Sequence, residues 1–552
     1  MSRATSKEDV VRGEAVKEQV TSNSEYPSQR NVIMVMACVF MAAFLVALDR
    51  LIIATAIPAI TDRFNSLDDI GWYVSGYLLP MAGFQLLVGR IYTFYNPKWV
   101  YLTCISIFEL GSLICGVAPN STTLIVGRAV AGLGSCGVTS GAIILVVHTV
   151  PLHKRPMYTG FMGMVFGIAS VVGPLLGGVF TDKLSWRWCF YINLPIGGFV
   201  MVIIFIFLKV DFEAPKKLSL TDKLLRLDPL GTLFIVSSMV CLLLALQSGG
   251  TQWSWSSWRI ILLLSLFAVV FVAFVAVQLW RKEKATVPPR FFTYRSIVFG
   301  FWWAFCNGAS TQTMAYYVPI WFQAIKGVSA VKSGIMFIPM VLGLVVSSIM
   351  AGILTRKIGY YTQWMYISAV MTPIGAGLIS TFNTSTGHSE WIGYQVLYGL
   401  GLGLGMQQAT VAAQTVLPKQ DVPTGASLMF LGQTLGGSVF ASVANNIMLN
   451  QLASGLMSAQ IPGVDPGVVT SVGATDLRRY VSEDALQQVL MIYNVALRHA
   501  FYVGTAVSAA LIIGALGMEW KSVKQQKVQP PKQGEEKDAQ VVERKAVDVE
   551  RQ

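Results

Sequence analysis

Long uninterrupted apolar runs alternate with short polar segments along most of this chain. An α-helix needs about 20 apolar residues to cross a hydrocarbon core roughly 30 Å thick, and about fourteen runs meet this requirement. The pattern predicts an all-α integral membrane protein, because the runs are too long for the alternating strands of a β-barrel and lipid cannot satisfy free backbone amides. The predicted spans are residues 33–60, 71–91, 99–118, 122–147, 157–181, 188–208, 228–248, 259–280, 296–322, 333–355, 361–382, 391–416, 424–449 and 499–518.

The distribution of lysine and arginine between the connecting segments predicts the orientation. With the N-terminus in the cytoplasm, the short cytoplasmic connections carry about three times as many basic residues as the opposite ones, and about twice as many when segment 450–498 is counted. An even number of spans then places both termini in the cytoplasm. Two sequons, at Asn120 and Asn383, fall in connections predicted to lie outside and are candidate glycosylation sites.

The runs group into two bundles separated by a basic linker. We expect a disordered cytoplasmic segment at 1–32, a six-helix bundle at 33–208, a linker with two extra spans at 209–295, a second six-helix bundle at 296–518 and a disordered cytoplasmic tail at 519–552. The longest external connection is 450–498. The apolar stripe in its second half, up to Leu497, predicts a helix that lies along the outer surface, covers an opening, or is simply solvated.

Composition narrows the class of protein. The 552 residues are 54% hydrophobic and 13% charged, whereas soluble chains carry about 25% charge. This excludes a soluble enzyme and a secreted disulfide scaffold. The net charge of +12 comes from basic residues scattered through short connections between apolar runs, as at the cytoplasmic side of a membrane. This distribution does not predict nucleic-acid binding. The seven cysteines lack metal or redox spacing, and no phosphate-binding loop is present, so we expect no disulfide, metal, cofactor or ATP-driven step.

Three ionisable residues fall inside predicted spans, where burying a charge is costly and usually functional. Asp49 lies in the first span, Glu109 in the third and Arg128 near the start of the fourth. A carboxyl group removed from water is less stable when charged, and a nearby arginine opposes this effect. The three residues are therefore candidates for proton coupling. The alternative interpretation is a static ion pair that holds helices together.

Neutral amides and aromatic side chains recur within the spans. Such groups can hold a bulky apolar molecule through burial, stacking and a few hydrogen bonds, or they can join helices and mark the lipid interface. As a set they predict a substrate cavity. The candidates are Gln85, Trp303, Asn307, Gln312, Tyr316, Gln323, Gln407, Gln408 and Gln433.

Glycine is frequent, and the fifth span contains Gly173, Pro174, Gly177 and Gly178. Small residues let helices approach closely, and a proline inside a helix permits a bend. We expect this segment, together with the glycine-rich residues 399–405, to form surfaces on which the two bundles move.

Several segments resemble signatures of the major facilitator superfamily, specifically its fourteen-span drug:proton antiporters in their fungal form. Residues 48–58 resemble the first-span signature, and residues 124–134 resemble the fourth-span motif whose arginine, here Arg128, is linked to proton coupling. Residues 173–178 are similar to the fifth-span antiporter motif. Residues 186–195 and 317–327 resemble junctions typical of this branch.

The connection between spans 2 and 3 departs from the superfamily pattern. Gly89 and Arg90 are present, but Thr93 stands where the superfamily has an aspartate, so the charge relay implied for that gate lacks its acid. The counterpart in the second bundle keeps its glycines and base, at Gly352, Arg356 and Gly359.

The resemblance implies two bundles that rock around a central cavity and export hydrophobic or amphipathic toxins, other secondary metabolites or drugs in exchange for protons. It implies a monomer in the lipid bilayer of the plasma membrane, with the vacuolar membrane as the alternative. A siderophore or vacuolar amino-acid carrier of the same fold is the alternative function. Spans 9 to 14 offer no acid at mid-depth for a small cationic substrate. A receptor or membrane enzyme is the third hypothesis, and the four scattered histidines do not suggest a catalytic site.

Overall fold

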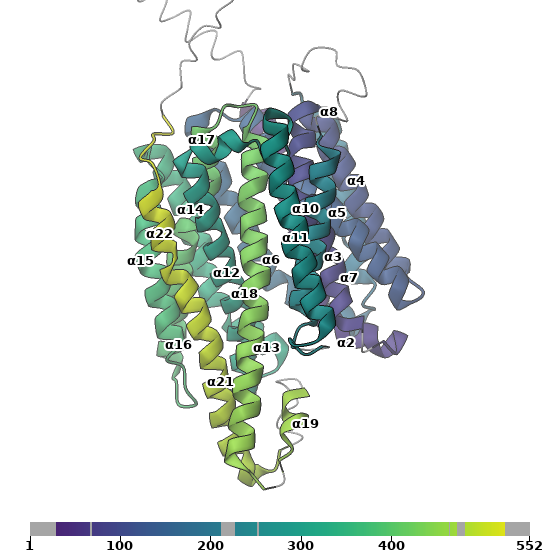
Figure 1. Cartoon of the computed structure of the whole chain (residues 1–552), viewed down its shortest axis with the longest axis vertical. Helices are drawn as coiled ribbons and strands as arrows, with labels where there is room; N and C mark the ends of the chain where they lie inside the picture. The colour runs from purple at the N-terminus through teal and green to yellow at the C-terminus, as the bar shows by residue number, and fades with distance from the viewer. Residues whose placement is uncertain are drawn as a thin grey trace, which may run out of the picture.

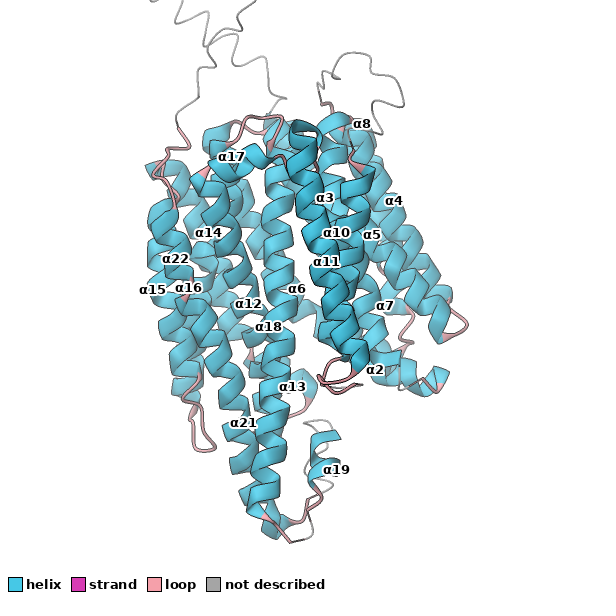
Figure 2. Cartoon of the chain, viewed as in Figure 1, coloured by secondary structure: helices cyan, strands magenta, loops and turns pink. Residues whose placement is uncertain are grey.

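The computed structural model describes residues 29–66, 69–210, 227–250, 253–462, 464–471 and 481–524. Long helices run roughly parallel along the vertical axis of the molecule (Figure 1). The described residues contain helices and two isolated bridges but no extended strand (Figure 2). The predicted all-α class is therefore confirmed.

The helices follow the expected order of bundle, linker and bundle. The first bundle contains α2 (Gln29–Phe64), α3 (Ile70–Phe94), α4 (Pro97–Val117), α5 (Ser121–Thr149), α6 (Arg155–Lys183), α7 (Trp188–Tyr191) and α8 (Asn193–Phe207). The linker contains α10 (Pro229–Ser248) and α11 (Trp258–Arg281), followed by the short turns η3 (Lys282–Lys284) and η4 (Pro289–Thr293). The second bundle contains α12 (Arg295–Ala324), α13 (Ala330–Met336), α14 (Ile338–Ile358), α15 (Thr362–Ile379), α16 (His388–Gly405), α17 (Gln408–Val416), α18 (Val422–Ala459), α19 (Pro466–Ser471), α21 (Glu483–Ala509) and α22 (Leu511–Gly517).

Within the described residues, eleven helices are long and apolar enough to cross a bilayer. Helices α12, α15 and α16 occupy three further predicted spans, but they are not among the eleven. The count of fourteen therefore remains a prediction. The end of the bundles that carries the α5–α6 and α14–α15 connections, at the top of Figure 1, is the one expected to face the cytoplasm, and it is called the inner end below.

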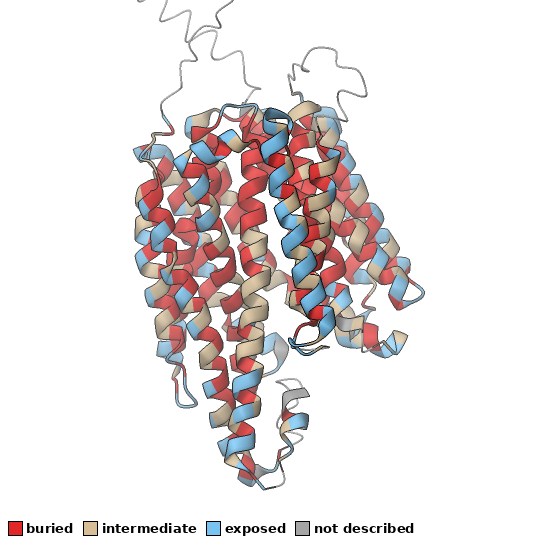
Figure 3. Cartoon of the chain, viewed as in Figure 1, coloured by how far each residue is buried: buried red, intermediate tan, exposed pale blue. Residues whose placement is uncertain are grey.

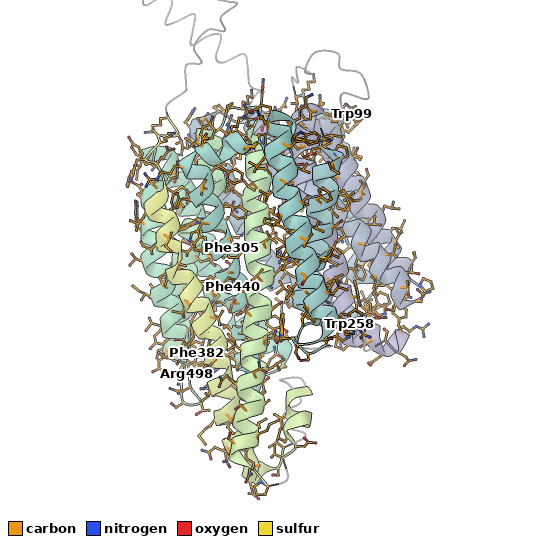
Figure 4. The ribbon with its side chains drawn as sticks, viewed as in Figure 1. Trp99, Trp258, Phe305, Phe382, Phe440 and Arg498 are labelled. Atoms are coloured by element: carbon orange, nitrogen blue, oxygen red, sulfur yellow. The ribbon has the colours of Figure 1, made fainter. Side chains whose placement is uncertain are left out.

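The two bundles meet mainly through α6 against α14 and through α3 and α5 against α18. The two extra helices lie over one of these seams, because α10 packs against both α3 and α18 and α11 packs on α10. Most side chains of α11 are exposed (Figure 3), as expected of a helix that faces lipid. Trp99 and Trp258 are exposed near opposite ends of the bundles (Figure 4), where aromatic side chains favour the membrane interface.

The segment 450–498 is not a long loop, which corrects the sequence-based prediction. Helix α18 continues to Ala459 and α21 already begins at Glu483, and the two extensions pack against each other beyond the outer end of the bundles (Figure 1). The predicted apolar stripe is helical, and Val489 and Leu497 within it are buried. It is the first part of the last long helix, because its apolar face is covered by α18. Residues 472–480, including Leu477, lie outside the described residues.

The start of the predicted disordered tail belongs to the folded structure. The backbone N–H of Val523 donates to the carbonyl of Gly359 at 2.8 Å, and Trp520 stacks on Tyr366 with ring centroids 5.8 Å apart. Gly359 ends α14 with φ +102°, a conformation that glycine adopts without strain. The rest of the tail, residues 525–552, and the N-terminal residues 1–28 lie outside the described residues.

A buried carboxylate holds the linker together at its inner end. Asp228 precedes α10, and its oxygens accept hydrogen bonds of 2.9 Å from the backbone of Gly231, the amide of Gln278 and both the backbone and hydroxyl of Thr286. Arg281 Nη1 lies 3.5 Å from the same carboxylate. One side chain thus joins α10, α11 and the segment that leads to the second bundle.

Replacing Asp228 by Ala will lower the temperature at which the purified protein unfolds in detergent. Each buried donor left without a partner costs about 1–3 kcal/mol, and several donors share this acceptor. The Asp62→Ala variant removes an exposed carboxylate from α2 and is the matched control. Equal unfolding temperatures for both variants and the wild type would show that the network contributes no stability.

Candidate functional site

The two charged residues singled out in the first and fourth spans form an ion pair in the interior of the first bundle. Arg128 Nη1 on α5 lies 2.6 Å from Asp49 Oδ2 on α2, and the two side chains are 1% and 0% exposed. The guanidinium also donates through Nε to the carbonyl of Tyr73 and lies over the Tyr77 ring, 4.3 Å from its centroid. Buried charges are tolerated only with such partners, so the pair is a strongly coupled unit.

The amide of Asn193 extends this unit toward a second acid. Its Nδ2 donates to Asp49 Oδ1 at 3.2 Å and to Ser112 Oγ at 3.1 Å. Glu109 lies one turn before Ser112 on α4, is buried, and has no hydrogen-bond partner for either carboxyl oxygen. Glu109 packs against Gly197 of α8, where a larger side chain would overlap its carboxyl group. Two acids and their polar connections therefore lie within one bundle.

The inner half of the seam between the bundles is closed by glycine contacts and hydroxyl groups. Gly89 of α3 touches α18: a Cβ atom there would lie 2.8 Å from the Cβ of Ser427 and 3.2 Å from the carbonyl oxygen of Pro423. Ser427 Oγ donates to Ser140 Oγ of α5 at 3.3 Å, and Gln85 donates to the same hydroxyl at 2.5 Å. Gln85, predicted to line a cavity, instead bonds within the first bundle, to the same Ser140 hydroxyl that Ser427 of the second bundle contacts.

A second glycine contact closes the other seam. Ser348 Oγ of α14 donates to the carbonyl of Gly160 on α6 at 3.0 Å. A Cβ atom on Gly352 would lie 2.5 Å from the carbonyl oxygen of Pro156 and 3.1 Å from Cα of Met157. The backbones of α14 and α6 are thus in direct contact between the two bundles. Arg356, one turn further along α14, is exposed, and its Nη1 lies 3.5 Å from the sulfur of Met157.

A cavity of about 340 Å³ opens in the outer half of the seam between α3 and α18. Leucines from α3 and α10 form an apolar wall, and hydroxyl and amide groups from α12 and α18 face it. This volume and mixture of surfaces are typical of sites for drug-sized molecules. Its lining residues are Arg50, Gly71, Val74, Ser75, Leu78, Leu79, Leu243, Leu246, Gln247, Gln312, Tyr316, Gly437, Ser438, Ala441, Ser442 and Asn445.

Two of the nine predicted cavity residues, Gln312 and Tyr316, line this cavity. The indole N–H of Trp303 donates to the carbonyl of Gly405, and Gln323 Nε2 donates to Ser333 Oγ. The remaining candidates pack among helices of the second bundle. The buried amide atoms of Asn307 have no hydrogen-bond partner, and Gln407 is buried between α16 and α17. Gln408 donates to the carbonyl of Leu404, and the backbone of Gln433 contacts Gly308.

A comparison with protein-family models matches residues 39–441 to the Major Facilitator Superfamily. The chain belongs to the Major Facilitator Superfamily. It is 53% identical over 494 residues to the "MFS-type efflux pump MFS1" of Arthroderma benhamiae, with 89% of this chain and 91% of that protein covered. It is 48% identical over 503 residues to the "Rubrofusarin-specific efflux pump aurT" of Gibberella zeae, with coverage of 91% and 92%.

Among solved structures, the proton:xylose symporter XylE superposes with a TM-score of 0.55 at 12% identity, covering 89% of this chain and 95% of that one. At this identity the likeness shows the fold alone. Family and relatives together confirm the expected major facilitator fold. The protein is a multi-pass membrane efflux transporter of the fungal type, and it is not an enzyme.

Thr93 stands at the position after α3 where the superfamily pattern has an acid. Thr93 donates to the carbonyl of Gly89, one turn back on its own helix. Arg90 is buried, and the acids that act on it electrostatically are Asp228, Asp421 and Glu283. Asp421, at the start of α18, accepts from Arg290 Nη2 at 2.8 and 2.9 Å. The acids that act electrostatically on Arg90 thus come from the linker and the second bundle.

The glycines of the fifth span lie mainly inside one bundle, which corrects their expected place between bundles. A Cβ atom on Gly173 would lie 3.1 Å from Cβ of Leu51 on α2, and one on Gly177 would overlap Thr55 of the same helix. Gly178 comes near the second bundle, facing Val331 of α13 at 3.7 Å. Pro174 lies within α6. Residues 399–405 of α16 likewise pack against helices of their own bundle.

Sequence reasoning missed two features of the cavity. Arg50 follows Asp49 directly and is the charged residue in the lining. The position of this charged residue in the middle of the first predicted span was the sequence signal that could have indicated its place in the cavity. The extra helix α10 forms a wall through Leu243, Leu246 and Gln247, which no sequence pattern indicated.

The predicted glycosylation sites lie at the outer end of the bundles. Asn120 and Asn383 are both exposed, in the α4–α5 and α15–α16 connections. Each side-chain oxygen accepts a local backbone hydrogen bond, from Thr123 and Ser385 respectively. All seven cysteines are free and buried. The described residues contain no cluster of three or more potential metal ligands.

Proposed function

We propose that this transporter exports hydrophobic or amphipathic small molecules across the plasma membrane in exchange for protons, as a monomer. The observation that carries the proposal is the buried Asp49–Arg128 pair, which lies directly beside a cavity of mixed polarity. Asp49 faces the interior of the first bundle, and Arg50, the next residue of α2, faces the cavity. A proton and a solute can thus act on one helix without sharing a binding site.

The arrangement of the two seams supports alternating access. The inner half is closed by contacts at Gly89 and Gly352, while the cavity occupies the outer half. With the expected orientation, this is the state from which a cargo leaves toward the outside. Entry of a proton from outside would weaken the attraction between Asp49 and Arg128 and permit the helices to return.

The composition of the cavity supports an amphipathic cargo. Among the described residues, its lining contains no carboxylate, which a carrier of basic amino acids would need to hold its substrate. The related pump of Gibberella zeae, by its name, is specific to one compound, rubrofusarin. An organic small molecule is therefore the class of cargo that we assign to this chain.

Transport by everted plasma-membrane vesicles tests the proposal. Vesicles that contain the protein should accumulate at least one member of a panel of aromatic acids, neutral aromatics and lipophilic cations when their interior is made acidic. Collapse of the pH gradient should release the accumulated compound. The proposal fails if no member accumulates with a pH gradient of either sign while vesicles of a known proton-driven exporter do so.

A further inference from the structure

Of the residues that the structure describes, Arg50 places a positive charge in the cavity lining and none places a negative one there. Its guanidinium lies on α2, and Nη2 donates to Gln312 Oε1 of α12 at 3.3 Å across the seam between the bundles. The other lining residues in the described ranges are all uncharged. The cavity is thus electrostatically asymmetric.

The acid nearest in sequence does not neutralise this charge. Asp49 Oδ2 is bound by Arg128 and Asp49 Oδ1 by Asn193, both within the first bundle. Within the described part of the chain, no ion pair joins Arg50 to a carboxylate, and a neutral amide oxygen is its side-chain partner. An uncompensated cation that is partly removed from water is expensive. Charged residues inside membrane spans usually serve the binding or transport of a ligand.

The surroundings of Arg50 define the rest of the ligand. Leu78 and Leu79 of α3 and Leu243 and Leu246 of α10 provide an apolar surface, and Tyr316 offers an aromatic ring. A guanidinium forms its strongest hydrogen bonds with planar anionic oxygens. The matching molecule has an apolar body and one acidic oxygen group.

We propose that Arg50 selects the cargo, and that exported compounds carry an ionised carboxyl or an acidic phenol on an apolar body. The substrate class rests on the proposed export function, whereas the binding site is testable without transport. When such an anion binds, its oxygens replace Gln312 as the partner of the guanidinium. The anion then lies one residue from the proton-linked pair on the same helix.

Equilibrium binding to the full-length protein in lipid nanodiscs tests the inference. The probes are anthracene-9-carboxylate and its neutral analogue anthracene-9-carboxamide, followed by fluorescence with empty nanodiscs subtracted. The wild type should bind the carboxylate more tightly than the amide. Arg50→Gln should weaken carboxylate binding by about tenfold to a hundredfold, because a hydrogen bond to a charged group contributes roughly 1.5–3 kcal/mol. Binding of the amide should change little.

Three further variants separate charge selection from a structural role. Arg50→Lys keeps the charge and should retain the preference for the carboxylate. Gln312→Leu removes the partner of Arg50 and should also retain it; if it instead behaves like Arg50→Gln, Arg50 merely holds α12. Arg63→Gln removes an exposed charge at the end of α2 and should change neither affinity.

Three results would overturn the inference: no carboxylate binding by the wild type, equal affinity for the two probes, or equal weakening of both by Arg50→Gln. Because no pH gradient is applied, a protein that fails to export but keeps this preference would disprove only the export function. A protein that exports but lacks the preference would disprove only the role of Arg50.

Discussion

Asp49→Asn will abolish transport driven by a pH gradient and leave the exchange of labelled for unlabelled cargo intact. Asparagine has nearly the same shape and can still accept a hydrogen bond from Arg128, but it cannot take up a proton. The helices can therefore still reorient around a bound cargo, whereas the proton gradient no longer has a titrating group to act upon. Both activities can be measured in the same vesicle preparation.

The matched control is Asp62→Asn, which removes an exposed carboxylate from the same helix and should leave both activities unchanged. Arg128→Lys provides a second test, since lysine keeps the charge but cannot reproduce the contacts of the guanidinium with Asp49, Tyr73 and Tyr77. We expect it to reduce driven transport strongly. Full gradient-driven transport by Asp49→Asn would show that the proton is carried elsewhere, with Glu109 as the next residue to test.

Gly352→Val will shift the protein away from the conformation with a closed inner end. The Cβ of valine would overlap the backbone of Pro156 on α6, and backbone cannot move aside as a flexible side chain can. Overpacking of this kind costs about 1–3 kcal/mol, which corresponds to a change of about fivefold to 150-fold in the ratio of the two conformations. Transport should fall because one half of the cycle becomes unfavourable.

Labelling of an introduced cysteine measures this shift. Ser427→Cys places a thiol in the buried contact between α18 and α3, and the native cysteines are buried. A membrane-impermeant maleimide added from the cytoplasmic side should label this thiol faster in Gly352→Val than in the parent. Gly393→Val is the matched control, because nothing lies within 4 Å of a Cβ atom at that glycine. An unchanged labelling rate would show that the α6–α14 contact does not control the inner end.

The bundle architecture follows from properties that a sequence carries directly. The length of each apolar run sets where a helix crosses lipid, and the eleven spanning helices of the described residues fall on predicted runs. The contact between Asp49 and Arg128 could also be anticipated, since two opposite charges in neighbouring spans have few other partners. Gly89 and Gly352 lie at helix contacts between bundles, as expected of small residues.

Other features depended on how the helices are rotated about their axes. Gln85, Trp303 and Gln323 have the chemistry of cavity residues, but packing turns their side chains toward neighbouring helices. The glycines of the fifth span satisfy the same pattern as those between bundles, yet their partner is α2 of the same bundle. Composition along one helix does not specify which neighbour covers each face.

The amino-acid sequence by itself thus determined the helical class, the order of the spans and the residues able to carry charge in lipid, because burial of apolar runs and the cost of unpaired charges are local properties. Only the tertiary structure decided that Arg50 and α10 line the cavity, that acids of the linker and the second bundle act electrostatically on Arg90, and that α18 and α21 extend beyond the outer end of the bundles. These outcomes depend on contacts between different helices, some of them far apart in the sequence, and such contacts arise only when all helices pack together.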